Sequence, residues 1–133
     1  MEYYHNDAGL TKGEFEDYNN FLVSTAVSGN NNSISAAMNT NKNYFSDTNL
    51  MQDYLYLKMS WPEPFKWVYL TPSLQVIYNI EDKSALIGLP ISYKPITNVE
   101  FIFWPTFLLG NKKTEFGSKQ YKNKLDLWIR FYF

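Results

Sequence analysis

The sequence has no cysteine, no long apolar run and no excess of basic residues, and each of these shortages excludes a class of protein. Without cysteine there is no disulfide framework, no thiolate metal site and no thiol nucleophile. No apolar stretch approaches the roughly 20 residues that a membrane-spanning helix needs. The formal net charge is -1, so no basic field indicates nucleic acid as a partner.

The start of the chain also lacks a secretory signal. Met1 is followed at once by EYYHN, with neither a basic start nor an apolar stretch. A protein of this sequence that works outside the cytoplasm is therefore expected to need an upstream segment. The 133 residues are enough for one domain or for part of a larger one.

Aromatic residues, in contrast, are abundant at 19% of the chain, although the mean hydropathy is slightly negative at -0.36. Apolar and polar residues must therefore be interleaved. Two regions differ in this respect. Residues 7–50 are polar and rich in Asn, Ser and Thr, whereas residues 51–133 are dense in aromatics and alternate.

The polar region, 7–50, is predicted to be a long and partly helical loop that follows a partial strand over 1–6. Thr11 and Glu14 have the spacing of a capping box, which predicts a helix starting there. A weaker pattern predicts a second helix over 34–45. Loops of this length inside a domain are usually functional or cover something.

The second region, 51–133, is predicted to form β-strands because its apolar residues recur at every second position. Short connections join most of the strands, and a long charged one precedes the last. Short connections join antiparallel neighbours, so the fold class is all-β, an antiparallel meander of about five to six long strands. The predicted strands cover 52–61, 66–81, 84–94, 98–110 and 124–133.

Alternation alone does not say which solvent the apolar face meets. In a soluble sheet apolar side chains face the core, whereas in a membrane barrel they face lipid. Several strands reach about ten residues, near the roughly 9–11 that a tilted membrane strand needs. The polar face carries Tyr, Trp, Ser, Thr and Gln with a few opposed charges, which suits a crowded and wet interior. Both features favour the membrane barrel.

The ends of the predicted strands favour the membrane barrel as well. Aromatic side chains gather at one end of the meander, as rings do at a membrane–water interface. The short connections fall at that end and the long ones at the other, as in barrels with short periplasmic turns and longer external loops. The predicted aromatic girdle consists of Trp61, Phe65, Trp67, Tyr93 and Phe101.

The last strand, LDLWIRFYF, resembles the C-terminal strand of Gram-negative outer-membrane β-barrel proteins. Such strands end in an aromatic residue, usually Phe, with apolar residues at alternate positions before it. The resemblance covers 51–133 by pattern, and it implies recognition of this strand by the barrel assembly machinery. The residues to which it assigns that role are Leu125, Leu127, Ile129, Phe131 and Phe133.

The strand count predicts a barrel that this chain does not close alone. Five strands and a partial one fall short of the eight in the smallest familiar barrels, and open edges in lipid are costly. We therefore expect the C-terminal section of a larger barrel in the cell outer membrane. Its partners would be outer-membrane lipid, the assembly machinery, and the remaining strands or other protomers.

The expected function is that of a porin-like or export channel. Polar-face residues would line the lumen and tune its selectivity, although they could instead pair only to stabilise a filled barrel. A soluble antiparallel barrel that binds an apolar ligand, and a non-conducting structural or adhesion barrel, are the alternatives. The lumen-lining candidates are Tyr54, Tyr56, Lys58, Lys94, Glu100, Asp126 and Arg130.

Catalysis and metal binding are not expected. His5 lies beside Asp7, but no serine sits at a useful spacing nearby, and a lone histidine at the end of a strand is usually solvated. The acidic residues near the start of the predicted helix are favoured there by the helix dipole and need no cation. We therefore predict no enzyme activity, no cofactor and no metal.

Overall fold

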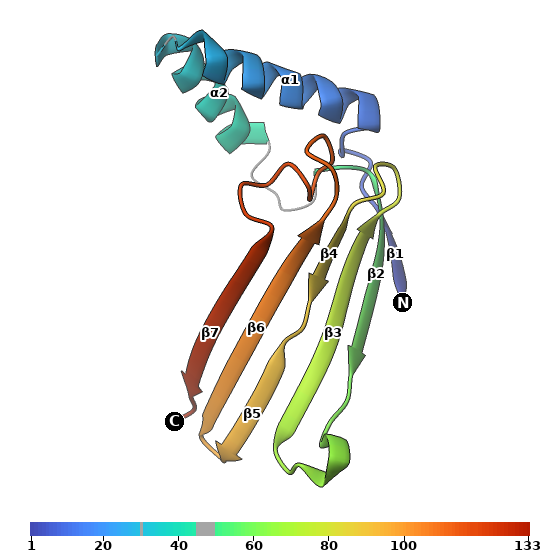
Figure 1. The fold of residues 1–133 in the computed structure, drawn as a ribbon, viewed down its shortest axis with the longest axis vertical. Helices are drawn as coiled ribbons and strands as arrows, with labels where there is room; N and C mark the ends of the chain where they lie inside the picture. The colour runs from blue at the N-terminus through green and yellow to red at the C-terminus, as the bar shows by residue number, and fades with distance from the viewer. Residues whose placement is uncertain (30, 45–49) are drawn as a thin grey trace.

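One antiparallel β-sheet makes up most of the fold, with two helices beyond one of its ends (Figure 1). The computed structural model describes residues 1–29, 31–44 and 50–133. Within them all strand pairings are antiparallel, which confirms the all-β prediction. The strands are β1 (Glu2–His5), β2 (Asp53–Ser60), β3 (Leu70–Asn79), β4 (Ala85–Gly88), β5 (Ile91–Ile96), β6 (Val99–Leu109) and β7 (Asn123–Phe131).

The order of the strands in the sheet follows the order of the chain, as the meander prediction requires. β4 and β5 lie end to end, because both pair with β3 on one side and with β6 on the other. Seven described strands therefore occupy six positions. Among these strands, β1 and β7 form the two edges of an open sheet.

The predicted strand over 84–94 is interrupted between β4 and β5. Pro90 has no backbone N–H to donate to a neighbouring strand, so the ladder stops there. The gap is narrow. The carbonyl of Pro90 still accepts from the Ser73 amide at 2.8 Å, and the Leu89 amide donates to the Pro105 carbonyl at 2.9 Å.

The connection between β2 and β3 is longer than the predicted tight turn. It contains a short 3-10 helix, η1 (Pro64–Lys66), and β3 starts at Leu70, four residues later than position 66. Several of its non-glycine residues have positive φ angles, among them Phe65 at 56° and Tyr69 at 70°. Residues other than glycine rarely adopt a positive φ angle, so local sequence preferences do not predict this connection.

The predicted capping box starts the first helix. α1 (Lys12–Ser28) begins after Thr11, whose hydroxyl accepts from the Glu14 amide while the Glu14 carboxylate accepts from the Thr11 amide at 2.8 Å. It ends at Gly29, whose φ of 63° is the left-handed conformation that glycine adopts freely.

The second helix, α2 (Asn31–Tyr44), begins three residues before the predicted start at position 34. Phe45, the last residue of that predicted helix, lies outside the described residues. Neither described helix combines the length and the apolar character needed to cross a membrane.

The buried core lies at the end of the sheet nearest the helices. Helix α1 contributes Phe15, and the loop between β6 and β7 contributes Phe116. Both pack against the sheet through a cluster of buried side chains. The core therefore ties one end of the sheet together and leaves the opposite end uncovered. The cluster consists of Phe15, Met51, Tyr54, Leu108 and Phe116.

The connections are sorted between the two ends of the sheet (Figure 1). The helix end carries α1, α2, the β3–β4 turn and the long β6–β7 loop over 110–122. The short-loop end carries the β2–β3 connection, the β5–β6 turn and the end of β7. The sequence pattern predicts this same grouping.

Candidate functional site

The sheet has one face that is almost wholly apolar. Residues directly opposite each other in an antiparallel pair point to the same side, so the register defines each face. Leu57, Val76 and Ile87 form one such row across β2, β3 and β4. We call this side the apolar face. Its members also include Met59, Leu74, Ile91, Phe101, Phe103, Phe107, Leu125, Leu127, Ile129 and Phe131.

The opposite side, the polar face, carries serine, threonine, glutamine and most of the charged side chains of the strands, together with Ile77, Leu86, Ile102 and Leu108. The register places six of the seven predicted lumen-lining residues on it, and Lys94 joins them through its ion pair with Glu100: Tyr54, Tyr56, Lys58, Lys94, Glu100, Asp126 and Arg130. Tyr54 differs from the other six because it is fully buried in the core at the helix end. It therefore belongs to the closed part of this face.

Burial along β6 differs between the two faces. Along β6, three polar-face residues are buried while three phenylalanines on the apolar face are exposed. The buried residues are Glu100, Ile102 and Leu108. The exposed residues are Phe101, Phe103 and Phe107. On β7, Leu127 is 71% exposed. Apolar side chains are normally the buried ones, and an exposed apolar surface of this kind is typical of a site that contacts protein or membrane.

The five residues of the predicted assembly signal lie on or directly after β7, at the edge of the sheet. Leu125, Leu127, Ile129 and Phe131 belong to the apolar face, and Phe133 follows them in the same alternation. All five are exposed, with exposed fractions of 54% or more. On its far side β7 has no partner among the described strands.

The polar face contains a charged cluster around Glu100, near the short-loop end. Ser92 donates its hydroxyl proton to Glu100 Oε1 at 2.5 Å, and Tyr132 donates to Oε2. Lys94 Nζ lies 3.8 Å from Oε1, and Arg130 Nη1 lies 3.7 Å from Oε2. We call these five residues the Glu100 cluster. Its carboxylate is shielded, whereas its two cations are half exposed.

Aromatic rings on the polar face lie beside these cations. The guanidinium of Arg130 sits 5.2 Å from the ring centroid of Trp128, and Lys94 Nζ sits 5.9 Å from that of Tyr132. Trp104 and Trp128 are neighbours, with ring centroids 6.2 Å apart. Trp104 lies over Gly88, where a Cβ atom would come within 2.8 Å of the indole nitrogen. A glycine there leaves room for the ring.

A second buried glutamate closes the polar face at the helix end. Glu115, in the β6–β7 loop, is fully buried and accepts three hydrogen bonds. The Leu50 amide donates at 2.7 Å, the Tyr54 hydroxyl at 2.7 Å and the Asn79 side-chain amide at 2.8 Å. The backbone amide of Glu115 donates to Asp82 Oδ2 at 2.6 Å. This network fastens the loop to β2 and β3.

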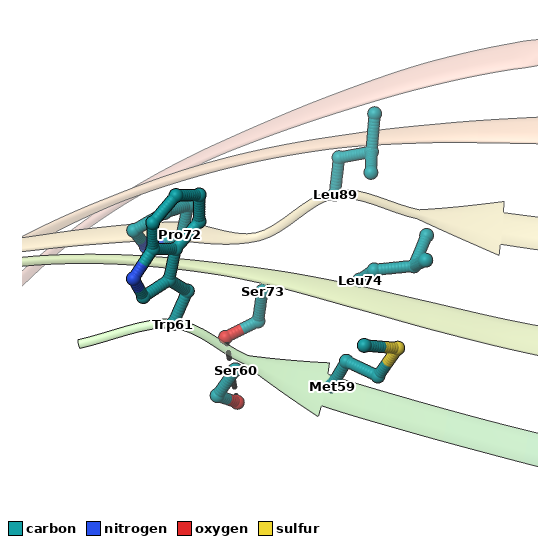
Figure 2. Close-up of a pocket in the computed structure, with 7 residues that line it drawn as sticks. All are labelled: Met59, Ser60, Trp61, Pro72, Ser73, Leu74 and Leu89. Atoms are coloured by element: carbon teal, nitrogen blue, oxygen red, sulfur yellow. Dashed lines mark hydrogen bonds between the residues drawn. The ribbon is translucent and has the colours of Figure 1, made fainter. Parts of the chain in front are cut away.

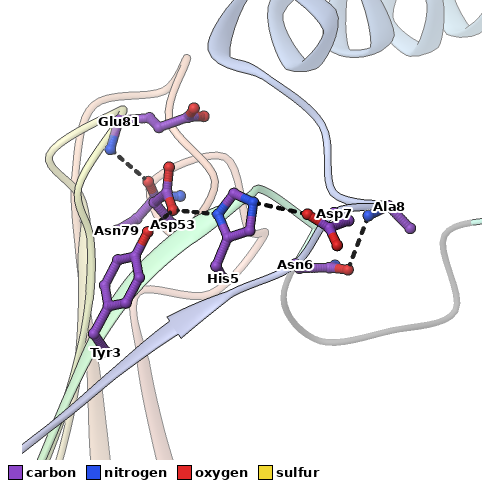
Figure 3. A network of polar contacts seen from close by, with 8 residues as sticks. All are labelled: Tyr3, His5, Asn6, Asp7, Ala8, Asp53, Asn79 and Glu81. Atoms are coloured by element: carbon purple, nitrogen blue, oxygen red, sulfur yellow. Dashed lines mark hydrogen bonds and ion pairs between the residues drawn. The ribbon is translucent and has the colours of Figure 1, made fainter.

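His5 joins the edge strand β1 to β2 (Figure 3). Its Nδ1 lies 2.6 Å from Asp53 Oδ1 and its Nε2 lies 3.0 Å from Asp7 Oδ1, while the Tyr3 hydroxyl donates to the same Asp53 oxygen at 2.5 Å. Both ring nitrogens of His5 therefore lie beside carboxylate oxygens. Within the described part of the chain, no set of three or more His, Cys, Asp or Glu residues is arranged to hold a metal ion.

The five residues of the predicted aromatic girdle lie at the short-loop end of the sheet, and all are exposed. Trp61 and Phe65 are in contact, with ring centroids 5.4 Å apart, and Tyr93 lies opposite Phe101 in the β5–β6 ladder. Trp67 and Tyr93 border a shared hollow. Trp61 also borders an open groove with Met59, Pro72, Leu74 and Leu89, as Figure 2 shows.

Two features of the site are absent from the sequence prediction: the buried network at the helix end and the aromatic residues of the polar face. The pattern assigns no role to Glu115 or Asn79, because burial of a loop glutamate depends on residues far away in the chain. It leaves Trp104, Trp128 and Tyr132 without a role, although their even spacing on the polar face is visible in the sequence. That spacing was the signal that could have identified them.

Comparison of the chain with protein-family models, with curated proteins and with solved structures gave no match. The features of the chain that bear on its function are the two faces of the sheet, its open edges and the Glu100 cluster.

Proposed function

We propose that this chain forms part of a transmembrane β-barrel in the outer membrane of a Gram-negative cell, where it serves as a porin-like or export channel. The carrying observation is the exposed apolar face: the phenylalanines of β6 and the apolar side chains of β7 lie in the open on one side of the sheet, while the buried residues of β6 lie on the other side. Each Å² of apolar surface that leaves water contributes about 25 cal/mol. A lipid environment supplies that gain over the whole apolar face without a protein layer.

The lengths of the strands support a membrane span. β3 has 10 residues, β6 has 11 and β7 has 9, which fits the roughly 9–11 residues of a tilted transmembrane strand. β4 and β5 together cross the same distance, since both lie between β3 and β6.

The two ends of the sheet support an orientation. The short connections lie at one end together with the aromatic girdle, and short connections are typical of the periplasmic side of outer-membrane barrels. The helices and the β6–β7 loop would then face the outside of the cell.

The open edges imply partners for the sheet. Six strand positions are fewer than the eight of the smallest familiar barrels, and unpaired backbone groups in lipid cost several kcal/mol each. Further strands, from the same polypeptide or from another protomer, would pair with β1 and β7. The exposed apolar positions of β7 would serve the assembly machinery as its recognition strand.

A non-conducting barrel is the second candidate, and the Glu115 network favours it. That network and the core around it cover the polar face at the helix end, where a channel would need an opening. A soluble barrel with an apolar ligand inside is disfavoured, because the apolar side chains lie on the exposed face.

Extraction and conductance test the proposal together. The protein should require detergent to stay soluble and should migrate differently on a gel before and after heating. In a planar lipid bilayer a channel gives discrete conductance steps, whereas a detergent-dependent protein without steps is the non-conducting barrel. A stable, folded monomer in plain buffer would show that the membrane proposal is wrong.

A further inference from the structure

Around Glu100 and Asp126 on the polar face, the bases are more exposed than the acids. The side chains of Lys94 and Arg130 are 54% and 47% exposed, whereas that of Glu100 is 8% exposed. The pair next along β7 is alike, since Lys124 is 52% exposed and Asp126 is 25% exposed. A solute beside this face meets cationic groups before it meets a carboxylate.

Glu100 holds two of these bases beside each other. Two cations that share a site repel each other, and a carboxylate between them offsets the repulsion. The oxygens of Glu100 already accept hydrogen bonds from Ser92 and Tyr132, so the carboxylate is fixed in position. Lys94 and Arg130 approach it only to 3.8 and 3.7 Å, which leaves their own donor groups for another acceptor.

Aromatic rings provide an apolar surface next to the two bases. The guanidinium of Arg130 lies over the ring of Trp128, and the ammonium of Lys94 lies over the ring of Tyr132. Trp128 is 44% exposed and Tyr132 is 46% exposed. Binding sites for small organic molecules combine such surfaces with a few polar groups that fix orientation. The neighbourhood therefore suits a molecule that has both a negative group and a carbon skeleton.

We infer that the polar face binds an anionic organic solute. Its carboxylate or phosphate groups contact Lys94 and Arg130, and its carbon skeleton lies against Trp128 and Tyr132. Guanidinium and ammonium groups are the usual partners of such oxyanions. This inference rests on the proposed function and deepens it, because it names the class of solute that the channel or barrel takes up.

A binding titration tests the solute class. The folded protein in detergent is titrated at low salt with glucuronate, glucose or inorganic phosphate while its tryptophan fluorescence is followed. We expect the highest affinity for glucuronate, which has both the carboxylate and the ring. Equal affinity for glucose would overturn the inference. Equal affinity for phosphate would overturn the aromatic contact.

Two variants test the residues. Lys94→Met and Arg130→Met should each lower the affinity for glucuronate by about fivefold, the effect of one charge pair at contact in water. Lys113→Met is the matched control, since Lys113 is an exposed cation in the β6–β7 loop at the helix end. Lys94 is half exposed, so its replacement leaves the fold intact, and gel mobility before and after heating checks this.

Conductance on the same samples separates this inference from the proposed function. Discrete conductance with glucuronate affinity unchanged in both variants overturns the inference alone. A soluble protein without conductance overturns the membrane function, whatever the titration gives. An affinity that falls in both variants and not in Lys113→Met supports the inference for a conducting or a closed barrel.

Discussion

Two buried glutamates on one side of the sheet, Glu115 at the helix end and Glu100 at the short-loop end, have opposite surroundings. The described donors to Glu115 are neutral: a backbone amide, a phenol and a side-chain amide. Glu100 has two hydroxyl donors but also two cations at its edge. The first carboxylate connects segments that are distant in the chain, and the second is the centre of the proposed solute site.

This contrast shows that burial of an acid does not define its role. Removal of a buried acceptor leaves its donors without partners, and the cost depends on whether water can reach them. Around Glu115 the partners are themselves buried, whereas Lys94 and Arg130 are half exposed. The comparison therefore predicts unequal effects from the same substitution at the two positions.

The largest effect is expected for Glu115→Ala. Three donors, one of them from the buried Tyr54 and one from the buried Asn79, lose their acceptor. The free energy of unfolding should fall by about 3–5 kcal/mol, as it does for broken buried networks. Urea unfolding in detergent measures it, with Glu16→Ala on the exposed side of α1 as the control. A loss no larger than that of the control would show that the network does not hold the loop.

A smaller effect is expected for Glu100→Ala. Lys94 and Arg130 can turn toward water, so only the hydroxyls of Ser92 and Tyr132 lose a partner. The free energy of unfolding should fall by about 1–2 kcal/mol. The same urea experiment compares the two variants directly. If Glu100→Ala costs as much as Glu115→Ala, the two ends are equally closed and the comparison fails.

Thr11→Ala should cost about 1 kcal/mol, because it removes the side-chain half of the capping box of α1. The loss should appear as faster amide hydrogen exchange in the first turn of α1, with the Glu115 network unaffected. Thr11→Ser keeps the hydroxyl and serves as the control. Faster exchange in the β6–β7 loop as well would mean that the helix and the network unfold together.

The smallest effect concerns the pH dependence of the same helix. Hydrogen bonds from the Thr11 amide and hydroxyl lower the pKa of Glu14 below its ordinary value of 4.5. A lowered pKa in the folded state adds stability above pH 4.5, and this stability is lost as the pH falls through the folded pKa. Helical circular dichroism should decline in that acidic window. Glu14→Gln should reduce the decline, and an identical pH profile in that variant would contradict the assignment.

Local patterns in the sequence were sufficient to predict most of the strands and the start of α1. Alternation with a period of two is a property of neighbouring residues, and so is the spacing of Thr11 and Glu14. The gap between β4 and β5 was also visible in principle, since Pro90 cannot donate to a ladder. The antiparallel order then determines which residues share a face, so the polar-face positions followed from the strands.

The contacts that build the site could not be predicted in this way. Glu115 reaches Leu50 and Asn79, which lie 65 and 36 positions away along the chain. The positive φ angles of Phe65 and Tyr69 contradict local preferences and depend on the surrounding fold. Alternation also does not distinguish which face is enclosed, because that depends on how the loops cover the sheet.

The two edges of the sheet are unequal in length, and in the proposed barrel this inequality would give assembly a direction. β7 offers a straight edge of nine residues. At the other side β1 covers Asp53–Tyr56, so residues 57–60 of β2 extend beyond it among the described pairings. A strand that pairs with β7 can add hydrogen bonds in one continuous register. A strand at the opposite edge would have to pair first with β1 and then with the part of β2 that β1 leaves uncovered. Pairing should therefore nucleate at β7 and finish at β1, so the last join to form is also the shortest.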